Sequence, residues 1–410
     1  MISGFQRTRR AGMILAAGMT SFAAQVEADP VPHTLLLRGE DLACTRTLVR
    51  DNDSSVMTPL KKLRREADKC LDAPLFIITE KKHPQPGFDP HDYVSLAKYY
   101  WPDPAKPGGL PYFSRDGEPN PEIEEYDNRT WGHMEHAVHN LAQAWYFTGE
   151  KKYAAGAARQ LRAWFLDPAT RMNPNLNHAQ LVKGKDTGRG MGIIDTHGLP
   201  ALLDDILLLH GASEWTTADE QNLRAWVREY LTWLRTSKNG RKEAEATNNH
   251  GNWYDAQAAA CALFIGDHTQ AREILEYTRH KRIPAQIEPD GQQPRELGRT
   301  LSINYTLFNL QALFACARLG EHAGVDLWNF RTPDGRSIRA ALDWVLPYAL
   351  QEKKWEHKQI SKQNFGPLIG LLRLAAVAWR EPAYEQALGK LKSSGDEKMW
   401  ADFYSPSPKK

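Results

Sequence analysis

Cysteine is scarce in this sequence, with 4 residues among 410. Neither a CxxC pair nor a zinc-type spacing occurs. Lys and Arg total 52 against 50 Asp and Glu, so the formal net charge is only +2 and no general positive field favours nucleic acid. Calcium loops, phosphate-binding glycine loops and G-x-S-x-G elbows are also missing. These absences exclude the common signatures of metal, nucleotide and serine-hydrolase sites.

The first residues have the composition of a targeting segment. Residues 1–10 hold three Arg and no acid, small apolar residues dominate 11–24, and Ala28 ends an Ala-x-Ala-like cleavage site. This pattern predicts a secretory signal peptide over 1–28 and a periplasmic or secreted mature protein over 29–410. No later apolar run is long enough to span a membrane.

The four cysteines fit an oxidising compartment without defining the fold. Cys44 and Cys70 flank a short N-terminal segment and could form a disulfide there. Cys261 and Cys316 lie in Ala-rich helical runs, where we expect buried free thiols.

Helical periodicity dominates the chain, while strand-type alternation is rare. Apolar residues follow helical spacing in the ranges 131–147, 153–165, 199–209, 223–234, 253–265 and 305–319. Three such helices are expected to end at Gly149, Gly266 and Gly320, each followed by an acidic residue that opens the next element. Repeated helical hairpins of irregular spacing predict an all-α fold, an α/α toroid or incomplete α/α barrel. Because no Ser/Gly-rich linker divides 29–410, we expect a single domain.

Aromatic residues are abundant, with 13 Trp, 14 Tyr and 13 Phe. Two long loops, 99–112 and 173–195, combine aromatic with polar side chains. Long loops on a rigid scaffold often carry function, and exposed rings stack on flat ligands or sugar faces. A proline-rich surface wrap explains the first loop equally well.

The strongest local cluster of polar residues is 247–255, which precedes an Ala-rich helix. Capping that helix needs only one polar residue. Asn249, His250 and Trp253 remain, and their spacing places them on one helical side. A functional cluster is therefore the better interpretation.

A second cluster, 288–305, is rich in charge and ends in Tyr305. A solvated turn with weak ion pairs is the simple explanation. Arg299 and Tyr305 are six residues apart, which is not one helical face. They can converge only if Arg299 lies at the start of the helix rather than inside it.

The runs NNHGNWYDAQ (248–257) and IEPDGQQPRELGRTLSINYTLFNLQAL (287–313) resemble the alginate-lyase superfamily of polysaccharide lyases. SLAKYYWPDP (95–104), MNPNLNHAQ (172–180) and GRGMGIIDTHGL (188–199) look like the same family. The branch containing family 38 is the most similar, and family 5 is more distant. The resemblance implies an α/α toroid that cleaves 1,4-linked uronate polymers, such as alginate or glucuronan, by β-elimination.

The resemblance also implies the catalytic residues. Asn249 and Arg299 would neutralise the uronate carboxylate and stabilise the charge that develops at C5. Tyr305 would be the general acid, with Tyr305 or His250 as the base. We expect the neighbouring arginine to lower the pKa of Tyr305. This chemistry requires no metal or other cofactor.

Other residues would hold the sugar chain. The predicted substrate-binding residues are Tyr100, Trp101, Gln180, Arg189, Trp253 and Glu296. The expected partner is an acidic polysaccharide, and we expect a monomer. The sequence does not distinguish alginate from glucuronan, or mannuronate from guluronate. It also does not show whether the enzyme cuts inside the polymer or at its end.

Two other functions compete with the lyase. An inverting glycoside hydrolase would need two carboxylates placed around a water molecule. The candidates are Asp195, Glu288, Asp290 and Glu296. A noncatalytic oligouronate-binding protein would bind the same polymer without turnover.

Overall fold

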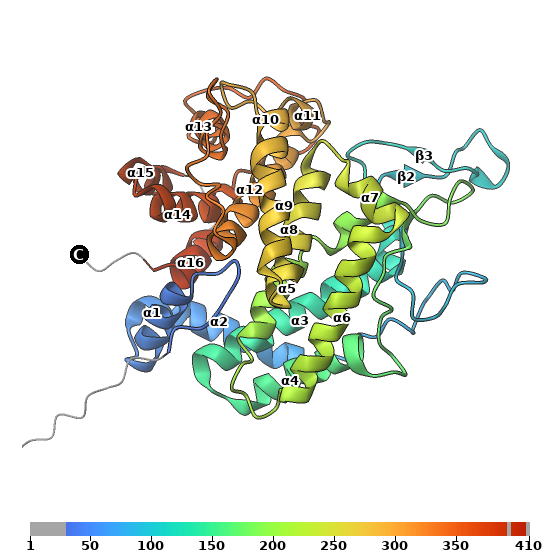
Figure 1. The fold of residues 1–410 in the computed structure, drawn as a ribbon, viewed down its shortest axis with the longest axis horizontal. Coiled ribbons are helices and arrows are strands. Elements are labelled where there is room, and N and C mark those ends of the chain that lie inside the picture. The colour runs from blue at the N-terminus through green and yellow to red at the C-terminus, as the bar shows by residue number, and fades with distance from the viewer. Residues whose placement is uncertain (1–29, 392–394, 407–410) are drawn as a thin grey trace, which may run out of the picture.

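The computed structural model describes residues 30–391 and 395–406, and nearly all of its regular structure is helical (Figure 1). The predicted signal peptide lies outside the described residues. The α-helices are α1 (Gly39–Arg50), α2 (Ser54–Leu71), α3 (Asp127–Thr148), α4 (Lys151–Leu161), α5 (Leu199–Leu207), α6 (Thr217–Thr236), α7 (Lys238–Ala244), α8 (Asn249–Phe264), α9 (His268–Tyr277), α10 (Ile283–Gln286), α11 (Pro294–Leu297), α12 (Ser302–Ala323), α13 (Ile338–Ala349), α14 (Leu368–Trp379), α15 (Pro382–Lys390) and α16 (Gly395–Tyr404). None of the described helices is long and apolar enough to cross a membrane.

Helix packing closes a ring. Going round it, α3 contacts α5, α5 contacts α8, α8 contacts α12, α12 contacts α14, and α14 contacts α16. Helix α16 then returns to α1 and α2, and α2 packs on α3. The hydroxyl of Thr45 in α1 donates to the carbonyl of Phe403 in α16 at 2.7 Å, which fastens this closure. The predicted all-α toroid is confirmed.

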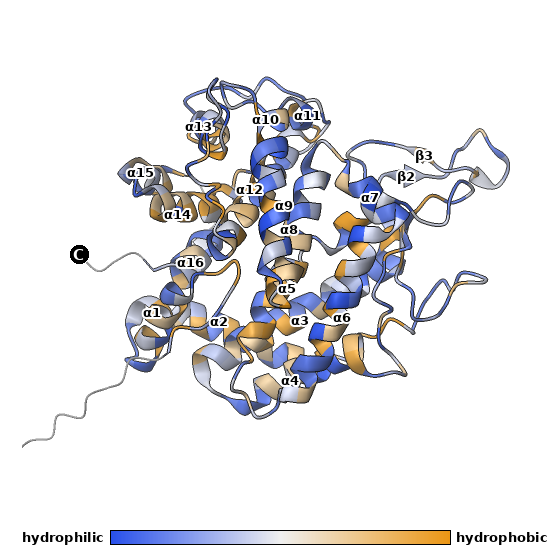
Figure 2. Cartoon of the chain, viewed as in Figure 1, coloured by the Kyte–Doolittle hydropathy of each residue, from blue (hydrophilic) through white to orange (hydrophobic). Residues whose placement is uncertain are grey.

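The helices form where the sequence places apolar residues at helical spacing. Helix α8 is buried almost all round, because it is rich in alanine and lies between α5, α6, α9 and α12. Helix α6 instead buries one side and exposes hydrophilic turns, as Figure 2 shows.

Two of the three predicted glycine helix ends are correct. Gly149 closes α3 with φ 70°, and Gly266 follows α8 with φ 84°. Gly320 does not end a helix, because α12 continues to Ala323 and Gly324 closes it with φ 70°. A Cβ atom at Gly320 would lie 2.4 Å from the carbonyl oxygen of Val325, so close packing requires glycine there.

Short strands lie at one edge of the toroid, on the right in Figure 1. Strand β1 (Val94–Leu96) pairs in parallel with β4 (His178–Leu181), and β2 (Tyr100–Trp101) pairs antiparallel with β3 (Phe113–Ser114). The remaining short turns are η1 (Pro107–Gly109), η2 (Pro121–Glu125), η3 (Arg162–Leu166), η4 (Gly190–Thr196) and η5 (Thr278–Arg282). Strand β2 lies within the first predicted loop, 99–112, and β3 follows directly after that loop.

All four cysteines are free thiols. Cys44 on α1 is exposed and Cys70 on α2 is buried, so the disulfide considered for them is not formed. Cys261 and Cys316 are buried, as expected.

Candidate active site

The first turn of α8 carries Asn249 beside a buried carboxylate. The backbone N–H and the side-chain Nδ2 of Asn249 donate to the two oxygens of Glu296, both at 2.7 Å. Each residue is only 1% exposed. Glu296 therefore holds Asn249 in place, and its contact with substrate stays a prediction.

His250 has a carboxylate partner that sequence analysis did not identify. Its Nδ1 lies 2.6 Å from Oε1 of Glu243, and the two side chains are 12% and 3% exposed. Because a carboxylate can only accept, Nδ1 carries the proton and donates it. The opposite nitrogen, Nε2, is then the one that can accept a proton from a ligand.

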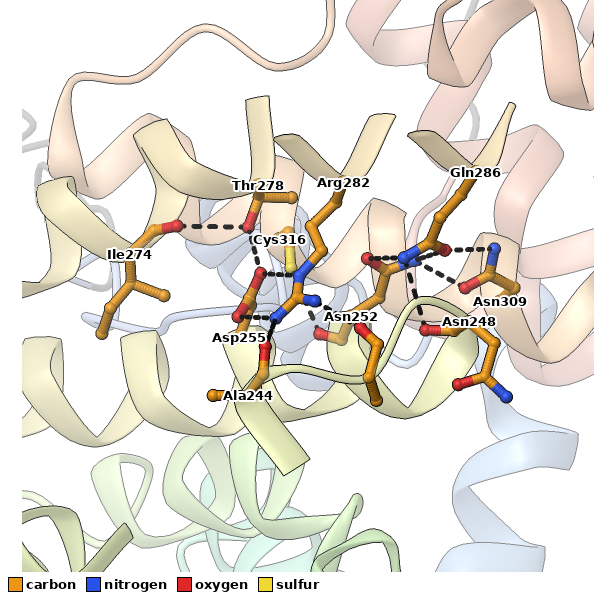
Figure 3. Close-up of polar contacts among 11 residues, drawn as sticks. Ala244, Asn248, Asn252, Asp255, Ile274, Thr278, Arg282, Gln286, Asn309 and Cys316 are labelled. Carbon is orange, nitrogen blue, oxygen red and sulfur yellow. Dashed lines mark hydrogen bonds and ion pairs between the residues drawn. The ribbon is translucent and has the colours of Figure 1, made fainter. Parts of the chain in front are cut away.

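Beneath this turn, Arg282 fastens the loop between α7 and α8 (Figure 3). Its guanidinium forms a buried two-pronged ion pair with Asp255, at 2.9 and 3.0 Å, and donates to the carbonyls of Ala244 and Ala246. Those carbonyls lie between Glu243 and His250 in sequence. Arg282 thus fixes the path of the chain that connects the two.

Arg299 lies between α11 and α12, just before the helix that carries Tyr305. Its guanidinium carbon is 3.7 Å from the centre of the Tyr305 ring. The condition for convergence, Arg299 outside the helix, is therefore met. Arg299 also pairs with Asp116, with Nη2 at 2.5 Å from Oδ1. Burial would raise the pKa of Asp116, but its bonds to Arg299 and Thr300 lower it overall.

The Tyr305 hydroxyl donates to the hydroxyl of Tyr99 at 2.7 Å. Burial, followed by the bond to Tyr99, raises the pKa of Tyr305 well above its ordinary value, although Arg299 acts to lower it. The expectation of a lowered pKa is wrong, because desolvation of the phenolate outweighs the attraction of the arginine.

Glu296 links the two halves of the site. Burial raises the pKa of Glu296 above its ordinary value, although the bonds to Asn249 and the charge of Arg299 act to lower it. The carboxylate is therefore close to residues from both clusters. Glu296 thus bonds to Asn249, the neighbour of His250 in the chain, and is influenced by Arg299, whose guanidinium packs on the ring of Tyr305.

The predicted sugar-binding residues divide into two groups. Tyr100 lies on β2 under the guanidinium of Arg189, which is 4.8 Å from its ring centre, and Trp101 is partly exposed beside it. Trp253 is instead 8% exposed and packs against Phe308 at 5.0 Å between ring centres, so it presents little surface to a sugar.

Gln180 is also less available than predicted. It is 8% exposed, and its side-chain Nε2 donates to Oδ1 of Asp195 at 2.7 Å. Arg189 donates to its Oε1 at 3.1 Å. Gln180 therefore orients Arg189 from beneath.

The four carboxylates considered for a hydrolase have separate local partners. Asp195 accepts from Gln180, and Glu296 accepts from Asn249. Glu288 pairs with Arg336 at 3.4 Å, and Asp290 accepts from Gln292. These partners do not set up an acid–base pair around a shared water position, which weakens the hydrolase hypothesis.

Three partners in the site were missed by sequence analysis: Glu243, Asp116 and Tyr99. Each contacts a predicted catalytic residue. Tyr99 was part of a noted aromatic loop, which was a usable signal. In the part of the chain that the structure describes, no group of three or more His, Cys, Asp or Glu is placed to hold a metal ion.

Comparisons with known proteins agree with this fold. A family model described as alginate lyase matches residues 78–355. The crystal structure of an alginate lyase from Bacteroides ovatus has 34% identity and a TM-score of 0.88, over 92% of this chain and 100% of that chain. The chain therefore belongs to the alginate lyase family.

A more distant likeness supports the fold alone. The crystal structure of alginate lyase A1-III from Sphingomonas species A1 has 18% identity and a TM-score of 0.57, over 90% of this chain and 95% of that chain. No curated protein sequence matches the chain.

Proposed function

We propose that this protein is an exported polysaccharide lyase that cleaves a 1,4-linked uronate polymer, with alginate as the first candidate and glucuronan as the second. The observation that carries the proposal is the convergence of an amide, an imidazole, a guanidinium and a phenol at one site. Family membership and the relative from Bacteroides ovatus support the reaction class.

The reaction removes the C5 proton beside a carboxylate and expels O4 from the neighbouring sugar. While the carboxylate is charged, that proton is only weakly acidic. Arg299 and the amide of Asn249 would neutralise the carboxylate and stabilise the enolate-like charge that develops. Their partners, the half-buried Asp116 and the buried Glu296, hold both groups in place before substrate arrives.

Proton transfer is then divided between two residues. Tyr305 is held as a neutral phenol, which suits a general acid that protonates O4. His250, with its Nδ1 proton directed to Glu243, presents Nε2 as the base for the C5 proton. The residues themselves provide the neutralisation and both proton transfers, so the proposal includes no metal.

The test is ultraviolet absorbance over time, because elimination leaves an absorbing double bond and hydrolysis does not. Purified protein would be offered polymannuronate, polyguluronate, glucuronan and hyaluronan separately, with a chelator present. We expect absorbance to rise on at least one polymer. A flat trace on all four from folded protein would contradict the lyase proposal, and reducing-end release would then test for hydrolysis.

A further inference from the structure

An open hollow of about 440 Å³ adjoins His250. Its size is in the range of ligand-binding pockets. The lining residues are Met191, Lys242, Glu243, Glu245, Ala246, Thr247, Asn248, His250 and Arg295. We call it the Lys242–Arg295 hollow. Because His250 belongs both to the hollow and to the candidate active site, a polymer bound at one can extend into the other.

Two exposed cations border the hollow. Lys242 pairs only loosely with Glu245, at 3.5 Å, and both side chains are at least 70% exposed, so this pair is weak. Arg295 is exposed, and among the described residues 30–391 and 395–406 no ion pair engages it. Both cations are therefore available to an incoming anion.

The floor of the hollow offers polar groups as well. Asn248 makes no side-chain capping bond, and Figure 3 shows its side-chain amide directed away from the buried network that its carbonyl joins. Thr247 is exposed beside it. An amide and a hydroxyl next to two cations match the hydroxyls and the carboxylate of a uronate unit.

Short stretches of chain connect the two cations of the hollow to the predicted catalytic residues. Arg295 on α11 is four residues before Arg299, and Lys242 on α7 is the neighbour of Glu243, the partner of His250. A uronate polymer carries one carboxylate per sugar. The sugar next to the one held by Arg299 would therefore need its own positive partner close by.

We propose that the Lys242–Arg295 hollow is a subsite that binds the carboxylate of a uronate unit adjacent to the scissile bond. This inference rests on the proposed function. Binding there displaces Glu245 from Lys242, which costs little because that pair is exposed. Glu243 stays buried on His250 and takes no part in binding.

The experiment compares wild type with Lys242→Ala, Arg295→Ala and the double variant, on oligouronates of increasing length and on polymer. For the double variant we expect KM on long substrates to rise about tenfold, as for lost bonds to a charged group, with kcat within about twofold of wild type. The rise should shrink on the shortest cleavable oligomer and at high salt. Arg295→Lys should restore most of the affinity.

The matched control is Arg228→Ala. Arg228 is an exposed cation on α6 that lines a different hollow, of about 510 Å³, beside Trp233 and away from the catalytic residues. It should leave KM unchanged at every length. A rise in KM that is equal at all lengths, or a change confined to kcat, would overturn the proposal.

A wild type that cleaves none of the polymers would refute the proposed function by itself. The hollow would then be tested by calorimetry with a uronate hexamer. A Kd about tenfold weaker for the double variant would support the subsite. Equal Kd values, or no binding by wild type, would refute it.

Discussion

Burial and the bond to Tyr99 keep the hydroxyl of Tyr305 protonated, against the pull of the neighbouring Arg299. The ring packs against the Arg299 guanidinium, and the hydroxyl bonds to Tyr99 at 2.7 Å. Burial raises the pKa of Tyr305 despite the arginine. At the scale of one residue, the raised pKa keeps Tyr305 in its neutral form, which can donate a proton, before substrate binds.

Replacing Tyr305 by phenylalanine should therefore abolish proton donation while leaving the fold of the protein unchanged. We expect kcat to fall by about 10²- to 10⁴-fold, the usual contribution of a general acid, with circular dichroism unchanged. Tyr99→Phe is the matched control, because it removes only the partner hydroxyl, and it should retain more activity. Near-full activity in a folded Tyr305→Phe protein would show that another group protonates O4.

Glu243 is expected to act through His250. Glu243→Gln keeps the size of the side chain but can present either an oxygen or an NH₂ group to Nδ1, so the proton is no longer fixed there. Replacing the carboxylate that fixes the tautomer of a catalytic histidine by an amide can lower kcat by as much as about 10⁴-fold, and we expect a loss of kcat between about 10-fold and that limit.

The readouts for Glu243→Gln are steady-state absorbance assays and the ¹⁵N shifts of the His250 ring. Glu243→Asp should recover part of the activity. Glu229→Gln, an exposed position on α6, is the control and should match wild type. Full activity of Glu243→Gln with an unchanged ring spectrum would remove Glu243 from the mechanism.

The sequence allowed prediction of the residues in the site but not of their partners. Asn249 and His250 are in one local motif, and Arg299 and Tyr305 are in another, so their patterns are visible in a single chain. Glu243 lies in KEAEAT, which reads as a solvated helix end, because nothing local distinguishes a buried acid from an exposed one. Asp116 is 183 residues from Arg299, and only tertiary folding brings them together.

At the scale of the element, the start of α8 depends on a glycine. A Cβ atom on Gly251 would lie 2.3 Å from the carbonyl oxygen of Ala246 and 2.4 Å from Nη1 of Arg282. The first of these is backbone and cannot turn aside. The glycine of the NHG run is therefore required by the close approach of the α7–α8 loop, which also carries the Glu243–His250 connection.

Gly251→Ala should lower the free energy of unfolding by about 1–3 kcal/mol through overpacking, and should reduce activity by displacing His250. Gly132→Ala on α3 is the control, since no atom lies within 4 Å of its added methyl group. That change should stabilise the protein by about 0.5–1 kcal/mol. Urea unfolding measures both, and equal stability of the two variants would contradict the packing argument.

Element boundaries show what sequence periodicity can and cannot reveal. The apolar repeat identified α3, α8 and α12, because a buried helical face leaves a regular pattern. It could not separate a closing glycine from a packing glycine, so Gly320 was misassigned and Gly324 was missed. The β2–β3 pair was also missed, because two-residue strands are too short to produce an alternating pattern.

At the scale of the whole molecule, the N-terminal segment ties together inner helices that are distant in sequence. Asp204 near the end of α5 accepts from the backbone N–H groups of Leu35, Leu36 and Leu37. Arg318 near the end of α12 donates to the carbonyls of Leu36 and Leu37. One short N-terminal segment thus bridges α5 and α12, and α16 closes the ring on α1.

Asp204→Ala should destabilise the entire toroid, because three backbone N–H groups would lose their acceptor at about 1–3 kcal/mol each. Burial raises the pKa of Asp204 to about 7, from an ordinary aspartate value of 3.8. Between those values the unfolded chain releases this proton and the folded chain keeps it, so wild type loses stability as pH rises.

The alanine variant lacks that titration. The difference in unfolding free energy between wild type and Asp204→Ala should therefore be larger at pH 5 than at pH 8, by about 2–3 kcal/mol. Urea unfolding of both proteins at the two pH values measures it. A difference that stays constant or grows with pH would mean that Asp204 is ionised throughout, with the three N–H bonds outweighing the cost of its burial.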